Sequence, residues 1–218
     1  MSQNGMEVAI AKAAADFTVP GEPPMGWLAR MVFRLLVFIY RQHKFTPIGE
    51  APEFRKFIII AVPHTSNWDF PNYVGLTREM GLRTQFMAKA SLFKWPMGTF
   101  MRQVGGVPVD RDAAKDMVQQ MAEEFAARDD FILTIAPEGT RSAATRWRTG
   151  FYHIAMAAKV PIVCGFMDYN TRRAGLGPVI HATGDYEADM APAFAFYEGM
   201  IGRRGEGLKG DAGKDMPG

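Results

Sequence analysis

Short apolar runs rich in β-branched residues alternate along this chain with segments of helical periodicity, and this alternation constrains its fold more than any other feature. The runs are 57–62 (FIIIAV), 131–135 (FILTI) and 160–163 (VPIV). Their composition is typical of strands that are buried on both faces of a sheet. Pro161 lies near the start of the third run, where its missing backbone N–H does little harm.

Helical patterns separate these runs. After Asp112, a candidate N-cap, apolar residues recur at helical spacing at Met117, Val118, Met121 and Phe125. We expect a second helix at 151–159, a late hairpin at 176–186 and a closing helix at 188–201. Strands that alternate with helices predict an α/β fold whose mixed, mainly parallel sheet is flanked by helices.

The segment 27–44 (WLARMVFRLLVFIYRQHK) predicts an N-terminal amphipathic helix. Its uncharged stretch is far shorter than the roughly 20 residues that span a bilayer. At about 100° per residue, four cations share an arc of about 80° beside a broad apolar surface; they are Arg30, Arg34, Arg41 and Lys44. This pattern favours a helix lying on an anionic membrane. The alternative is a helix packed on the domain core with its arginines in water.

The composition excludes several classes of function. The 218 residues carry 25 Lys and Arg against 23 Asp and Glu, and a charge so near balance argues against nucleic acid as a partner. The single cysteine, Cys164, excludes a disulfide framework and a multi-cysteine zinc site and is typical of an intracellular protein. The chain has no H-E-x-x-H, Walker or G-x-G-x-x-G motif, so no metal or nucleotide cofactor is expected.

These patterns divide the chain into four segments. They are a loosely ordered arm at 1–24, a basic amphipathic helix with a predicted membrane contact at 25–46, an α/β domain at 47–202 and a flexible tail at 203–218. The arm lacks the features of a signal peptide. The tail has too little apolar content to pack.

Three polar clusters stand where an α/β sheet gathers its ligands. The cluster 63–69 (PHTSNWD) follows the first strand, and 136–142 (APEGTRS) follows the second. A third, 105–111 (GGVPVDR), lies between them on a segment made flexible by glycine. Because ligands bind at the carboxyl ends of strands, we expect the three clusters to converge on one site.

His64 is the candidate general base, since neutral imidazole accepts a proton near neutral pH. Asp69 could hold the ring and stabilise the imidazolium. Five residues on one helix lie about 140° apart, so the pair requires His64 in the turn before a helix and Asp69 in its first turns. Ser66 offers a covalent serine mechanism as the alternative, but no G-x-S-x-G elbow is present.

Arg111 and Arg141 predict an anion pocket, because guanidinium groups bind phosphate in a bidentate manner. Glu138 could bind hydroxyl groups or orient Arg141. Gly139 would let the backbone approach a ligand closely. Lys89 is a further candidate for the same pocket.

Together, these clusters resemble the motifs of the glycerolipid acyltransferases, the lysophosphatidic acid acyltransferase family marked by His-x4-Asp. The four motifs match in order at His64 and Asp69, at Gly105 and Arg111, at 137–142 (PEGTRS) and at 160–163 (VPIV). Cys164 replaces the second proline of the fourth motif. The resemblance covers residues 57–165, half of the chain.

The resemblance implies transfer of a fatty acyl group from acyl-CoA or acyl-carrier protein to a lysophospholipid hydroxyl, with an acceptor like 1-acyl-glycerol-3-phosphate. His64 would be the base, and Asp69 would orient it. The headgroup would be bound by Arg111, Glu138, Gly139 and Arg141, with Thr140 and Lys89 as further candidates. The acyl thioester is a cosubstrate, and no cofactor or metal is implied. We expect a peripheral or monotopic enzyme of phospholipid biosynthesis on the cytoplasmic face of the cell membrane.

Three alternatives remain open at this point. The acceptor could be another lysolipid, such as an aminolipid or a glycolipid. Water could replace the acceptor, as in a thioesterase or lipid hydrolase, or the fold could serve as a non-catalytic lipid-binding domain. Six apolar residues either line an acyl groove, contact lipid or belong to the ordinary core; they are Met87, Phe93, Trp95, Met97, Phe100 and Met101.

Overall fold

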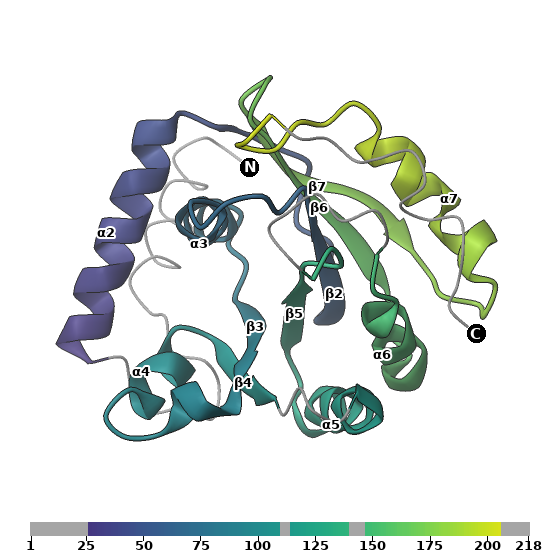
Figure 1. Ribbon diagram of the computed structural model, residues 1–218, viewed down its shortest axis with the longest axis horizontal. Helices are drawn as coiled ribbons and strands as arrows, with labels where there is room; N and C mark the ends of the chain where they lie inside the picture. Colours follow the sequence, from purple (N-terminus) through teal and green to yellow (C-terminus); the bar gives the residue numbers. More distant parts are fainter. Residues whose placement is uncertain (1–25, 110–113, 140–146, 206–218) are drawn as a thin grey trace.

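A twisted sheet lies at the centre of the protein, with helices on both of its faces (Figure 1). The computed structural model describes residues 26–109, 114–139 and 147–205. The strands of these residues are β1 (Thr46–Ile48), β2 (Lys56–Val62), β3 (Thr84–Lys89), β4 (Gly106–Val109), β5 (Phe131–Ile135), β6 (Ile162–Asp168) and β7 (Arg173–Ile180). Their order in the sheet is β1-β7-β6-β2-β5-β3-β4. Neighbouring strands pair in parallel except for β6 and β7, so the mixed, mainly parallel sheet is confirmed.

The helices form a layer on each side of this sheet. They are α2 (Trp27–His43), α3 (Asp69–Glu79), α4 (Gly98–Gln103), α5 (Ala114–Ala127), α6 (Gly150–Ala158) and α7 (Tyr186–Tyr197), with a short 3-10 helix η1 (Ala90–Phe93). In Figure 1, α3 and α2 lie on one side, and α5, α6 and α7 lie on the other. The N-terminal helix of the predicted fold is therefore present as α2. Thr46, which the predicted segment 25–46 included, already begins β1.

The predicted strands at 57–62 and 131–135 are confirmed as β2 and β5. The third begins two residues later than predicted and continues to Asp168. The hairpin predicted at 176–186 was wrong, because the reversal comes earlier and β7 pairs antiparallel with β6. Asp168 explains the earlier turn: its carboxylate accepts hydrogen bonds from the Asn170 N–H and the Thr171 hydroxyl, as turn-forming Asp residues do.

Three strands, β1, β3 and β4, were not predicted from the sequence; β1 lies at one end of the sheet, and β3 and β4 lie at the other. Part of the 105–111 cluster is therefore strand β4 rather than a flexible segment. This strand has four residues, one of them Pro108. Proline is tolerated on an edge strand, because one side of that strand forms no ladder.

Successive side chains of β2 pack in different parts of the core, because neighbouring residues of a strand point to opposite faces of the sheet. Ile58 and Ile60 join the large cluster under α5, α6 and α7. Phe57 and Ile59 pack on the opposite face with Leu82 and Leu176. Because both faces are covered, β2 is almost wholly apolar.

Helix α2 packs against α3 and keeps a second apolar face outside. Ala29, Phe33 and Tyr40 are buried, and Gly75 of α3 permits the close approach, since a Cβ there would lie 2.1 Å from Tyr40 Cγ. The exposed apolar side chains are Trp27, Leu28, Met31, Leu35 and Phe38. At about 100° per residue, the exposed apolar stripe lies roughly opposite the buried one. None of the described helices is both long enough and apolar enough to cross a bilayer.

Candidate active site

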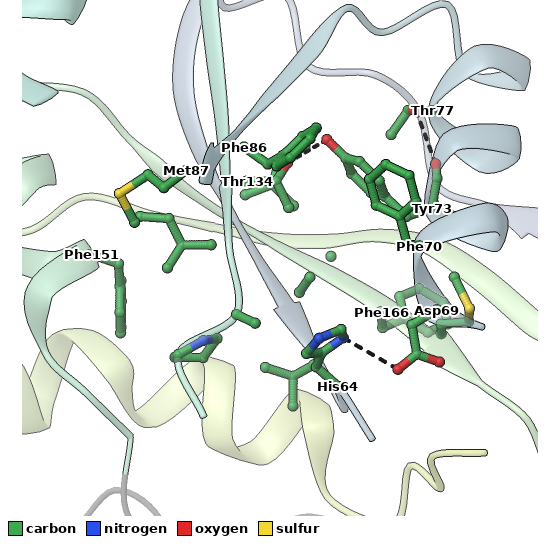
Figure 2. A pocket seen from close by; sticks show the side chains of 18 of the residues that line it. His64, Asp69, Phe70, Tyr73, Thr77, Phe86, Met87, Thr134, Phe151 and Phe166 are labelled. Carbon is green, nitrogen blue, oxygen red and sulfur yellow. Dashed lines mark hydrogen bonds and ion pairs between the residues drawn. The ribbon is translucent and has the colours of Figure 1, made fainter. Parts of the chain in front are cut away.

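His64 and Asp69 come together where β2 ends and α3 begins. The chain leaves β2 after Val62, and Asp69 is the first residue of α3. The His64 Nδ1 lies 3.2 Å from the Asp69 Oδ2, a contact that Figure 2 marks with a dashed line. The structure therefore has the arrangement that the five-residue spacing required, with the imidazole in the turn and the carboxylate on the helix.

The Asp69 carboxylate is buried and accepts several hydrogen bonds. Its Oδ2 accepts from the backbone N–H groups of Thr65 and Ser66 at 2.9 and 2.8 Å, and its Oδ1 accepts from the Tyr169 hydroxyl at 2.8 Å. Burial alone would raise the pKa of Asp69, but these bonds and the contact with His64 outweigh burial and lower the pKa. Asp69 is therefore ionised at neutral pH.

The ionised carboxylate determines which nitrogen of His64 carries the proton. A carboxylate can only accept hydrogen bonds, so the His64 Nδ1 that faces Asp69 must be the N–H donor. The Nε2 of the neutral ring then keeps its lone pair and can accept a proton. The His64 side chain is 28% exposed and lines the central cavity.

Glu138 lies beneath the same turn. Its Oε2 accepts a hydrogen bond from the backbone N–H of His64 at 3.1 Å. Glu138 follows β5, which pairs in parallel with β2, and so the two turns meet at the carboxyl edge of the sheet. The sequence prediction placed Glu138 near His64 but did not identify this bond.

Ser66 is held by its own turn. The Ser66 Oγ accepts a hydrogen bond from the Trp68 N–H at 3.2 Å, and the residue is buried. The His64 ring is directed toward Asp69 instead. This geometry favours direct base catalysis by His64 over the covalent serine alternative.

A mostly apolar cavity of about 760 Å³ opens beside His64. Under α3 its walls are formed by Phe70, Tyr73, Leu76, Met80, Phe86 and Ile59. Met87 and Phe151 line it on the other side of His64, and Figure 2 shows their side chains across the view from Phe70 and Tyr73. A cavity of this size and polarity is suited to a hydrocarbon chain.

Gly139 and Arg148 form a polar part of the cavity wall. Gly139 has φ +66°, and a Cβ there would lie 2.6 Å from the Arg148 Nε. The positive φ favours glycine at this position, and a Cβ there would force the Arg148 side chain to move. Arg148 was not among the residues predicted from the sequence, although its position in the basic stretch 141–148 (RSAATRWR) was a usable signal.

The other predicted residues are placed differently. Lys89 is the last residue of β3, opposite Val109 in the register of β3 and β4; it is exposed and does not line the cavity. Arg111, Thr140 and Arg141 lie outside the described residues.

Of the six apolar residues proposed for a groove, only Met87 lines the cavity. Phe100 and Met101 pack against the buried face of α2. Trp95 is 94% exposed, and Met97 is also exposed. Within the ranges that the structure describes, no cluster of three or more His, Cys, Asp or Glu side chains could hold a metal ion.

Known proteins share features of this sequence and of this fold. The family model described as acyltransferase matches residues 23–167. Among solved structures, the chain is similar to the 1-acyl-sn-glycerophosphate (LPA) acyltransferase PlsC from Thermotoga maritima, with a TM-score of 0.48, 19% sequence identity and 76% of each chain covered. A search of curated proteins finds no match.

Proposed function

This chain belongs to the acyltransferase family, and from that premise we propose that it transfers a fatty acyl group from an acyl-CoA or acyl-carrier-protein thioester to the hydroxyl of a lysophospholipid. The proposed acceptor is like 1-acyl-glycerol-3-phosphate. One observation carries the proposal: a histidine whose Nδ1 contacts a buried carboxylate lines a mostly apolar cavity.

His64 is the proposed general base. The acceptor hydroxyl gives its proton to the His64 Nε2 while its oxygen attacks the thioester carbonyl. The tetrahedral intermediate then collapses, the C–S bond breaks, and the imidazolium returns the proton to the leaving thiolate. The reaction so written needs neither a metal ion nor an acyl-enzyme intermediate.

Asp69 would act through the imidazole. Its negative charge holds the Nδ1–H and stabilises the imidazolium while His64 carries the second proton. The donors to Asp69 keep the carboxylate ionised in a buried position. This is the division of roles that a base and its orienting carboxylate require.

Cationic and hydrogen-bonding groups would bind the acceptor headgroup. The candidates from the sequence are Arg111, Glu138, Gly139, Thr140 and Arg141, to which we add Arg148 at the cavity wall; Lys89, the remaining sequence candidate, is exposed and does not line the cavity. A guanidinium favours a phosphate through paired charge-assisted hydrogen bonds. A phosphate-bearing acceptor is therefore favoured over an uncharged one.

We also propose that the enzyme works as a peripheral or monotopic protein on the cytoplasmic face of the cell membrane, with α2 as its contact. The exposed apolar stripe of α2 stands beside the arginines Arg30, Arg34 and Arg41. An apolar face with a cationic flank is suited to the headgroup region of an anionic bilayer.

The test is coenzyme A release from palmitoyl-CoA with and without lysophosphatidate, followed by lipid analysis. Release that depends on lysophosphatidate, with phosphatidate as product, supports the proposal. Palmitate instead of phosphatidate would identify a hydrolase. Transfer only to a lyso-aminolipid or a lyso-glycolipid would show that this lipid, and not lysophosphatidate, is the acceptor.

His64→Ala is the control for the mechanism. It should reduce transfer at least about a hundredfold, as expected for the loss of a general base. The variant should remain folded, because the His64 side chain is partly exposed and not part of the core. Transfer at the wild-type rate would remove His64 as the base.

A further inference from the structure

We propose that Tyr169 is a positioning residue, whose hydroxyl, held in turn by Asn72, fixes the Asp69 carboxylate and through it the His64 ring. The inference rests on the proposed function, since it assigns His64 the role of base. Tyr169 lies in the turn between β6 and β7, a hundred residues from Asp69 in the sequence. None of the four sequence motifs includes it.

The contacts form one continuous chain of hydrogen bonds. The Tyr169 hydroxyl donates to the Asp69 Oδ1 at 2.8 Å, and the Asn72 Nδ2 donates to the Tyr169 hydroxyl oxygen at 2.8 Å. Behind them, the His43 Nδ1 lies 2.6 Å from the Asn72 Oδ1. This chain of hydrogen bonds thus runs from His43, the last residue of α2, to His64, the proposed base.

The direction of every bond in this chain follows from its end at Asp69. The carboxylate can only accept, so the one proton of the Tyr169 hydroxyl is committed to it. The Tyr169 oxygen is then an acceptor, and Asn72 must present its NH₂ group to it. That leaves the Asn72 Oδ1 facing His43, whose Nδ1 must carry a proton.

This chain of hydrogen bonds matters because it holds the second oxygen of the Asp69 carboxylate, the Oδ1. The Oδ2 is held by the Thr65 and Ser66 N–H groups and faces the His64 Nδ1. Rotation about the Cβ–Cγ bond would move both oxygens, so a hydrogen bond to the Oδ1 adds to the resistance that the contacts of the Oδ2 offer. The Tyr169 bond to the Oδ1 opposes this rotation and fixes the plane into which the His64 N–H points.

The surroundings keep Tyr169 protonated and in place. Burial, followed by the neighbouring Asp69, raises the pKa of Tyr169 well above its usual value. The ring packs edge-on against Phe45, with 5.1 Å between the two ring centroids. The backbone N–H of Tyr169 donates a hydrogen bond to the Ile201 carbonyl at 2.9 Å. The guanidinium groups of Arg172 and Arg203 lie 6.0 and 5.9 Å from the ring.

Tyr169→Phe tests the inference, and Tyr40→Phe is its matched control. Tyr40 packs in the same apolar cluster, and its hydroxyl donates to another carboxylate, the Glu79 Oε2, at 3.2 Å. Each change removes one hydroxyl and leaves the ring. Both variants are compared with the wild type in palmitoyl-CoA transfer to lysophosphatidate.

The expected result separates positioning from a merely structural role. Tyr169→Phe should lower kcat about tenfold, the effect of losing one hydrogen bond to a charged group, and leave the KM for palmitoyl-CoA within about twofold. Tyr40→Phe should keep the wild-type kcat. An unchanged kcat for Tyr169→Phe, or an equal loss in both variants, would overturn the inference.

A second measurement needs no substrate. In ¹⁵N spectra of histidine-labelled protein, with His64 assigned by its loss in His64→Gln, the wild-type ring should be protonated at Nδ1. Tyr169→Phe should add the Nε2–H form, and Tyr40→Phe should not. An unchanged His64 signal in Tyr169→Phe contradicts the inference. If the wild type forms no phosphatidate, the proposed function fails, and these spectra still decide the role of Tyr169.

Discussion

The backbone N–H of His64 donates a hydrogen bond to the Glu138 Oε2, 3.1 Å away and 74 residues later in the chain. The bond joins the turns after β2 and β5, which are neighbours in the sheet. The proposed base is therefore held from two sides, by Glu138 at its backbone and by Asp69 at its ring. Glu138 has a structural role at the base besides its proposed role in headgroup binding.

We expect Glu138→Ala to impair the enzyme more than Glu138→Gln. The amide of glutamine keeps an oxygen that can accept from the His64 N–H, whereas alanine leaves that N–H without this acceptor, at a cost of about 1–3 kcal/mol. Transfer assays should show kcat at least about tenfold lower for Glu138→Ala than for Glu138→Gln. Equal loss in both would indicate that the charge of Glu138, rather than this bond, is what matters.

We expect Ala61→Phe to shorten the acyl chain that the cavity accepts. Ala61 lines the cavity near the end of β2 and is not fully buried, so a phenyl ring there would occupy part of its volume. Transfer from palmitoyl-CoA should fall by about tenfold or more, while transfer from octanoyl-CoA should change little. Equal loss with both donors would mean that the chain does not enter this cavity.

We expect the double variant Arg30→Glu, Arg34→Glu to bind anionic vesicles more weakly. Each cation near an anionic surface contributes about 1 kcal/mol, so the two reversals should reduce co-sedimentation by at least about tenfold. The control is Arg173→Glu, Arg204→Glu, which changes the net charge equally at exposed sites outside α2. If both double variants bind equally, α2 is not the membrane contact.

We expect the free energy of unfolding to fall below about pH 4. Burial would raise the pKa of Asp168, but hydrogen bonds from Thr171, Ile201 and Asn170 outweigh it and lower the pKa. An unfolded Asp titrates near pH 3.9, so the stabilisation is complete above that pH and is lost as the pH falls through the lower folded pKa.

Urea unfolding at pH 3 and pH 6 measures this dependence. Asp168→Asn should be less stable than the wild type at pH 6 and should lose less stability on acidification. Asp129→Asn, at an exposed carboxylate, should follow the wild type. If Asp168→Asn loses as much stability as the wild type, Asp168 is not a source of the acid sensitivity.

Local patterns in the sequence were enough for β2, β5 and β6, for the helices α2, α5, α6 and α7, and for the central pair. The β-branched runs became β2 and β5 as predicted, because a strand buried on both faces must be apolar along its length. His64 and Asp69 could be paired from their spacing, since a turn followed by a helix brings residues five apart together. Short strands at the sheet edge, such as β4 with its proline, had no comparable pattern.

The sequence by itself determined the fold class, the His64–Asp69 pair and the acyltransferase resemblance, because each can be recognised from periodic patterns or from motifs whose own residues are close in the chain. The tertiary structure decided the rest of the site. Tyr169 reaches Asp69, and Glu138 reaches His64, only because the order of the strands brings their turns to one edge of the sheet. Periodicity and motif spacing carry no information on that order, since hydrogen bonds between distant segments depend on how the strands are arranged in space.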